Sequence, residues 1–122
     1  GYSGIAKLLE EKVESEVVLL DCLTNMVSNL LLDNHVDWDM VTPNDVNKME
    51  DKIMLEIDEL LECIKKYKGD FIIVSNELGM GLVPPYPLGR YFRDISGRIN
   101  QRIAHESQEA YMVVSGLTVQ IK

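Results

Sequence analysis

Cysteine is scarce in this chain. Cys22 and Cys63 are its two cysteines, and no CxxC pair or zinc-ligand spacing occurs. A disulfide scaffold needs many cysteines in a short chain, and a zinc site needs them in close pairs, so neither class is indicated. We expect both cysteines to be small buried apolar residues, and the cytoplasm is the expected location.

An excess of positive charge and long apolar runs are also missing. Lysine and arginine total 12 against 20 aspartate and glutamate, which gives a formal net charge of −8. Nonspecific nucleic-acid and membrane-surface binders carry a basic excess, so we expect no nucleic-acid and no membrane partner. No apolar run approaches the ~20 residues of a transmembrane helix, and we expect no signal peptide. Hydrophobic content of 46% with 26% charged residues is typical of a globular domain.

The start of one long helix is marked clearly. Thr42 is the expected N-cap, Pro43 occupies the first helical position, and Asp45 stands where a capping box needs an acceptor. Gly69 is the expected stop. We expect Glu50 to lie on the solvated face of this helix, opposite an apolar stripe formed by Val46, Met49, Ile53, Ile57, Leu60 and Ile64.

The remaining pattern alternates helices with strands, as in an α/β sheet. Apolar residues at helical spacing predict helices over 3–13 and 22–32. A further helix follows the glycine-rich segment and carries one apolar stripe, made of Leu88, Phe92, Ile95, Ile99 and Ile103.

Short continuous apolar runs predict the strands. Those over 17–20, 70–75 and 111–114 are expected to be buried strands, and the strand over 17–20 is expected to be buried on both faces. After a turn at Ser115-Gly116, apolar and polar residues alternate over 117–121, which predicts an edge strand.

Functional signals concentrate where strand 70–75 ends. Ser75, Asn76 and Glu77 end the apolar run, and a segment rich in glycine and proline follows. Open α/β proteins bind ligands beyond the carboxyl ends of their strands, and arginine suits phosphate because its planar fork donates two parallel hydrogen bonds. An alternative stays open, in which the glycines only shape a loop and the arginines only solvate a helix. All the arginines of the chain follow this loop: Arg90, Arg93, Arg98 and Arg102.

Two long motifs resemble one known family. Residues 76–84 read Asn-Glu-Leu-Gly-Met-Gly-Leu-Val-Pro, and residues 88–101 read Leu-Gly-Arg-Tyr-Phe-Arg-Asp-Ile-Ser-Gly-Arg-Ile-Asn-Gln. Together with Val-Val-Leu-Leu-Asp-Cys-Leu-Thr over 17–24, they resemble the C-terminal part of the bifunctional adenosylcobinamide kinase and adenosylcobinamide-phosphate guanylyltransferase family. The resemblance covers essentially the whole chain, with a variable stretch at about 33–68.

The resemblance implies a fold and a departure from it. The implied fold is the C-terminal portion of a P-loop (RecA-like), mostly parallel α/β sheet flanked by helices, with an antiparallel edge strand at the C-terminus. The family's GxxxxGK[ST] phosphate loop does not occur in these 122 residues. The histidine that accepts the guanylyl group is also missing, because His35 and His105 do not match its place. We therefore expect residues 1–122 to be a single truncated α/β domain, roughly the C-terminal two-thirds of the family's domain.

The resemblance also implies an activity, cofactors and partners. The parent enzyme would phosphorylate adenosylcobinamide, a corrinoid substrate, using GTP or ATP with Mg²⁺. It would then transfer GMP from GTP onto that phosphate, completing a step of adenosylcobalamin biosynthesis. A homo-oligomer, by family a trimer, is implied, and the chain alone is predicted to be inactive. The alternative is a natural short form that acts as a non-catalytic binding or assembly partner. The genomic sequence upstream of the Gly1 codon distinguishes the two.

Asp21 and Thr24 are the candidate nucleotide-binding residues. Asp21 ends a predicted buried strand, where a carboxylate can hold Mg²⁺ or its water shell beside nucleotide phosphates, and the family has an acidic residue at the matching position. The alternative for Asp21 is a cap on the helix that starts at Cys22. Thr24 would contribute through its hydroxyl group.

The candidate contacts to substrate or phosphate follow the next strand. Glu77 could bind metal, accept a hydrogen bond from a substrate hydroxyl, or only brace the loop. An internal pair between Arg93 and Asp94 is left open beside a phosphate contact. The full candidate set is Asn76, Glu77, Gly79, Gly81, Arg90 and Arg93.

Overall fold

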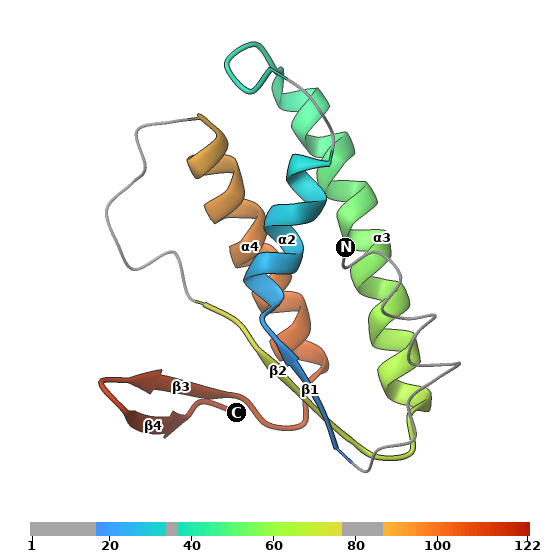
Figure 1. The fold of residues 1–122 in the computed structure, drawn as a ribbon, viewed down its shortest axis with the longest axis vertical. Helices are drawn as coiled ribbons and strands as arrows, with labels where there is room; N and C mark the ends of the chain where they lie inside the picture. Colours follow the sequence, from blue (N-terminus) through green and yellow to red (C-terminus); the bar gives the residue numbers. More distant parts are fainter. Residues whose placement is uncertain (1–16, 34–36, 77–86) are drawn as a thin grey trace.

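The computed structural model describes residues 17–33, 37–76 and 87–122. The predicted helix over 3–13 lies outside these ranges. The elements are, in order, β1 (Val17–Asp21), α2 (Leu23–Leu32), α3 (Pro43–Lys66), β2 (Asp70–Val74), α4 (Pro87–Glu106), β3 (Tyr111–Val114) and β4 (Leu117–Gln120). Figure 1 shows α2 between the longer helices α3 and α4, with β1 and β2 below them and the hairpin β3–β4 near the end of α4. The α/β class is confirmed.

Strands β1 and β2 form a parallel pair. Val17 lies opposite Asp70, and the register runs to Asp21 opposite Val74. The connection between the two strands passes through α2 and α3, as parallel pairing requires a crossover. The carboxyl ends of both strands therefore meet at one edge of the sheet, which is the edge that carries Asp21 and Asn76.

Strands β3 and β4 form a separate antiparallel hairpin. Ser115 and Gly116 have φ angles of 52° and 76°, so both turn residues are left-handed, as in the tight turn that matches the twist of a hairpin. The predicted turn and the antiparallel pairing of the last strand are confirmed. Among the described residues this strand pairs with β3 in a separate sheet and is not an edge of the parallel sheet. The expectation that strand 111–114 is buried is wrong, since Val113 is 66% exposed. Among the described strands β3 pairs only with β4, so it gains no cover from the parallel sheet.

Helix α3 begins as its sequence predicts. The Thr42 hydroxyl accepts a hydrogen bond from the Asp45 backbone N–H, and the Asp45 carboxylate accepts one from the Thr42 N–H, each at 3.2 Å. These backbone and side-chain hydrogen bonds to Thr42 lower the pKa of Asp45. The ionised carboxylate therefore stabilises the fold above its ordinary pKa, and that contribution is lost as the pH falls through the lowered value.

The predicted stop of α3 at Gly69 is wrong. The helix ends at Lys66, and Tyr67 leaves it with extended backbone while its N–H donates to the Ile64 carbonyl at 3.1 Å. An extended residue ends the helix without a left-handed glycine, so Gly69 is not needed for this purpose. Within the described ranges, no helix is both long and apolar enough to cross a membrane.

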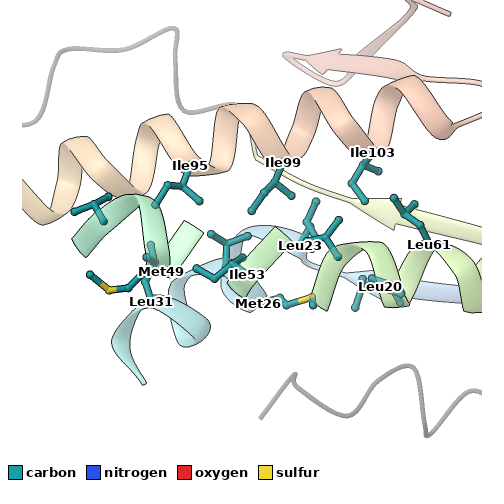
Figure 2. Packing of buried hydrophobic residues seen from close by; sticks show 14 residues of the cluster. Leu20, Leu23, Met26, Leu31, Met49, Ile53, Leu61, Ile95, Ile99 and Ile103 are labelled. Carbon is teal, nitrogen blue, oxygen red and sulfur yellow. The ribbon is translucent and has the colours of Figure 1, made fainter. Parts of the chain in front are cut away.

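The core lies between the three helices and one face of the parallel pair. Figure 2 shows Ile95, Ile99 and Ile103 in a row along α4, facing side chains of α2 and α3 such as Leu23 and Ile53. The predicted stripe of α4 thus supplies its buried side. The buried apolar residues are Leu20, Leu23, Met26, Val27, Leu31, Val46, Met49, Ile53, Ile57, Leu60, Leu61, Ile95, Ile99 and Ile103.

The parallel strands have one covered face and one bare face. Val18, Phe71 and Ile73 pack against the core, whereas Leu19 and Ile72, which lie opposite each other, are 59% and 51% exposed. The prediction that β1 is buried on both faces, and that β2 is a buried strand, is therefore wrong for the described residues. The bare face is defined by Val17, Leu19, Ile72 and Val74, each of which is exposed.

We expect the chain alone to self-associate through this bare face and the outer edges of β1 and β2, which pair with no other described strand. Exposed apolar surface and unpaired strand edges are both surfaces that other chains cover. Light scattering coupled to size-exclusion chromatography over a dilution series should report species above the monomer mass of 13.9 kDa.

A double variant and a matched control make this test specific. Leu19→Glu with Ile72→Lys places opposite charges on neighbouring strands of the bare face and should shift the species toward monomer. Leu55→Lys, at an exposed apolar residue of α3, should not. A wild-type chain that stays monomeric at every concentration, with no binding of an apolar dye, would contradict the prediction.

Candidate functional site

Asp21 stands at the carboxyl edge of the parallel pair, as the sequence predicts. Its side chain is exposed and makes no hydrogen bond with the residues that the structure describes. The alternative that Asp21 caps the next helix is wrong. Helix α2 begins at Leu23, its N-cap is Cys22, and no side chain caps it. The carboxylate is therefore available at the edge of the sheet, and its role toward nucleotide or metal stays a prediction.

Thr24 and Asn76 are joined directly. The Thr24 hydroxyl accepts a hydrogen bond from the Asn76 backbone N–H at 2.8 Å and lies 3.4 Å from the Ser75 hydroxyl. Thr24 is only 8% exposed, so the first turn of α2 is held against the residues that follow β2. The structure thus brings together a candidate nucleotide-binding residue and a candidate contact to substrate or phosphate.

Asn100 of α4 completes this polar cluster. The Ser75 hydroxyl donates to Asn100 Oδ1 at 2.6 Å, and Asn100 Nδ2 donates to the Asn76 carbonyl at 3.3 Å. Neither Ser75 nor Asn100 was predicted as a site residue. In the sequence, Asn100 follows the apolar residue Ile99 on a helix that comes after the glycine-rich segment. This position suggests that Asn100 lies near the core, but it does not identify the groups that Asn100 contacts.

Two of the arginines of α4 bind α3. Arg98 donates from Nε and Nη2 to the two carboxylate oxygens of Glu50, at 2.6 and 2.5 Å, and the Arg102 guanidinium lies 3.1 Å from Asp58. The hydrogen bond to Glu50 raises the pKa of Arg98. The expectation that Glu50 faces solvent is wrong, since its side chain is 15% exposed. These two arginines link α4 to α3, so their role is structural.

Arg90 and Arg93 lie nearer the start of α4. Both Arg93 Nε and Nη2 donate to Asp94 Oδ1, at 3.1 and 2.9 Å. The internal pair that the sequence left open is therefore present, and it holds Arg93 in a defined orientation. Arg90 is exposed. A phosphate contact by either arginine stays a prediction. Glu77, Gly79 and Gly81 lie outside the described residues.

The comparison with known proteins decides the family. Residues 2–121 match the family model described as cobinamide kinase / cobinamide phosphate guanyltransferase. The chain belongs to this family. The resemblance read from the motifs is thereby confirmed.

Three curated relatives show how much of such a protein the chain represents. It is 46% identical over 110 residues to the bifunctional adenosylcobalamin biosynthesis protein CobU of Escherichia coli (strain K12), covering 88% of this chain and 59% of the relative. The corresponding CobU of Salmonella typhimurium is 40% identical over 112 residues, with the same coverage. The protein CobP of Pseudomonas aeruginosa is 33% identical over 117 residues, covering 96% of this chain and 60% of the relative. The chain thus spans about three fifths of the relatives it matches.

The metal-binding side chains of the described residues suit one kind of metal site. Within the described ranges, no group of three or more histidine, cysteine or acidic side chains could hold a metal ion alone. Mg²⁺ is commonly held by one or two carboxylates together with substrate phosphates, and the exposed Asp21 carboxylate fits that mode. Cys22 and Cys63 form no disulfide and are each half-buried, so the expectation that both are buried is wrong.

Proposed function

We propose that this chain is the C-terminal part of an adenosylcobinamide kinase and adenosylcobinamide-phosphate guanylyltransferase. The observation that carries the proposal is the family match over residues 2–121, combined with Asp21 and the Thr24–Asn76 contact at one edge of a parallel strand pair. This edge is where α/β proteins of the parallel type bind ligands. We further propose that the domain is a truncated P-loop, RecA-like sheet, and that the complete protein is a homo-oligomer, a trimer by family.

In the proposed kinase step, a hydroxyl oxygen of adenosylcobinamide attacks the terminal phosphate of GTP or ATP. The bond from that phosphate to the leaving oxygen breaks, GDP or ADP departs, and the hydroxyl proton is released. Mg²⁺, when bound, neutralises charge on the transferred phosphate. Asp21 would hold this ion through its exposed carboxylate. Positioning and electrostatic stabilisation supply most of the catalysis in such reactions, and the chain would contribute them through Asp21.

Substrate and phosphate contacts are proposed for the segment after β2. Asn76, Glu77, Gly79, Gly81, Arg90 and Arg93 form this set, and the Asp94 pair would orient the fork of Arg93. Thr24 would serve the nucleotide site by holding the backbone of Asn76. In the GMP transfer, a histidine that residues 1–122 do not supply would attack the α-phosphate of GTP and release pyrophosphate. The phosphate of adenosylcobinamide phosphate would then take up the GMP and free the histidine.

The test uses a protein made of the N-terminal residues that precede the matched region in the Escherichia coli relative, placed before Gly1; we call it the joined protein. With labelled ATP or GTP and Mg²⁺, the joined protein should phosphorylate adenosylcobinamide, and the chain alone should not. The complete Escherichia coli protein is the control. A folded joined protein without turnover, under conditions in which the control turns over, would contradict the proposal.

A further inference from the structure

The hydrogen bonds after β2 form a closed ring. It connects Thr24 on α2, Ser75 and Asn76 after β2, and Asn100 on α4. Three elements that are distant in sequence therefore meet around one peptide segment. Both the N–H and the C=O of Asn76 are bound by side chains that belong to two different helices.

The chemistry of the groups sets the direction of every bond in the ring. The Asn76 carbonyl can only accept, so the Asn100 amide must turn its NH₂ group toward it and its Oδ1 toward Ser75. Ser75 then uses its one proton on Oδ1, at 2.6 Å. The Thr24 hydroxyl, which accepts from the Asn76 N–H, is left to donate to Ser75 across 3.4 Å. Each group in the ring both gives and receives, so each bond polarises the next.

The ring fixes the place where the strand ends. The segment Ser75-Asn76 is exposed, and a strand end of this kind can exchange its hydrogen bonds with water. Here the backbone of Asn76 is tied instead to α2 and α4, while its own side-chain amide takes no part in the ring. The peptide that carries the Asn76 side chain is thereby held in place.

We propose that Asn100 is a positioning residue of the candidate site: through Ser75 and the Asn76 carbonyl, it sets the orientation in which β2 presents Asn76 to a bound substrate. The effect on turnover rests on the proposed function. The ring itself does not. The ring needs one side chain at position 100 that both donates to the Asn76 carbonyl and accepts from Ser75. The short planar amide of asparagine carries both a donor and an acceptor.

Aspartate at this position keeps the shape and loses the donor. Asn100→Asp would retain the bond from Ser75, but it would place a carboxylate oxygen against the Asn76 carbonyl and break the ring there. Gln101→Glu is the matched control, because it makes the same change of charge at the next residue of α4, which is exposed and outside the ring. Ser75→Ala opens the ring at a second point without adding charge.

The first measurement is amide hydrogen exchange at Asn76 in the chain alone, followed by NMR. Opening the ring should speed this exchange by roughly 5-fold, as the loss of a hydrogen bond worth about 1 kcal/mol implies. We expect this in Asn100→Asp and Ser75→Ala and not in Gln101→Glu. Unchanged exchange in both ring variants would show that the ring is absent, and the proposal would fall.

The second measurement is steady-state kinetics on the joined protein. Misplacement of a substrate-orienting group lowers kcat more than it changes KM, so we expect kcat to fall about 10-fold or more in both ring variants, with KM for the nucleotide changed less than about 2-fold. Faster exchange with unchanged kcat would reduce Asn100 to a structural residue and overturn the proposal. If the wild-type joined protein shows no turnover, both the proposed function and the positioning role of Asn100 are contradicted. The hydrogen-exchange data would still show whether the ring of hydrogen bonds exists.

Discussion

Asp21→Asn in the joined protein is expected to lower Mg²⁺-dependent phosphorylation of adenosylcobinamide by about 100-fold, the scale on which single electrostatic groups act in catalysis. Asparagine keeps the shape of the side chain and removes the charge that would hold the cation. The fold should be unaffected, because the Asp21 side chain is exposed and makes no hydrogen bond with the described residues. Turnover measured against Mg²⁺ concentration, together with the melting temperature, checks both statements.

Asp70→Asn is the matched control for this variant. Asp70 begins β2, pairs with Val17 at the opposite end of the sheet, and is also exposed. It therefore undergoes the same change of charge in the same parallel pair, away from the candidate site. Equal turnover of Asp21→Asn and Asp70→Asn at limiting Mg²⁺ would show that Asp21 holds no metal.

The sequence predicts best where a local pattern determines the structure. The capping box of Thr42 and Asp45 depends on residues three positions apart, and the structure contains both of its hydrogen bonds. The turn at Ser115-Gly116 and the isoleucine stripe of α4 are local in the same sense. In each case the interacting groups lie within a few positions of one another, so spacing alone identifies them.

Burial of the strands could not be predicted in this way. The run Val17–Leu20 is apolar at every position, which indicates two covered faces, yet Leu19 faces outward. The apolar residues of a run show only that either face of the strand could be buried. Whether a face is buried depends on the helices and strands that pack against it, and these lie elsewhere in the chain. The same limit applies to β3, whose apolar residues do not reveal that its described partner is β4 alone.

The polar residues of α4 show a second limit. Arg98 and Asn100 are two positions apart and read alike from sequence, as polar residues in a family motif. The structure sends Arg98 to Glu50 on α3 and Asn100 to Ser75 and Asn76 after β2. Their partners are 48 and about 25 positions away, and no local spacing encodes such contacts. The sequence motif therefore indicates where the candidate site lies. It does not show that Arg98 has a structural role and Asn100 a positioning role.

The central claim is that this chain carries the part of the site around Asp21, while the phosphate loop and the acceptor histidine lie outside residues 1–122. Covalent guanylylation tests this claim most directly. The chain alone and the joined protein should be incubated with GTP labelled on its α-phosphate, with Mg²⁺, and the protein-bound label counted after denaturation. We expect near-stoichiometric GMP on the joined protein and none on the chain alone, because neither His35 nor His105 stands at the matching place. Stoichiometric labelling of the chain alone would contradict the account.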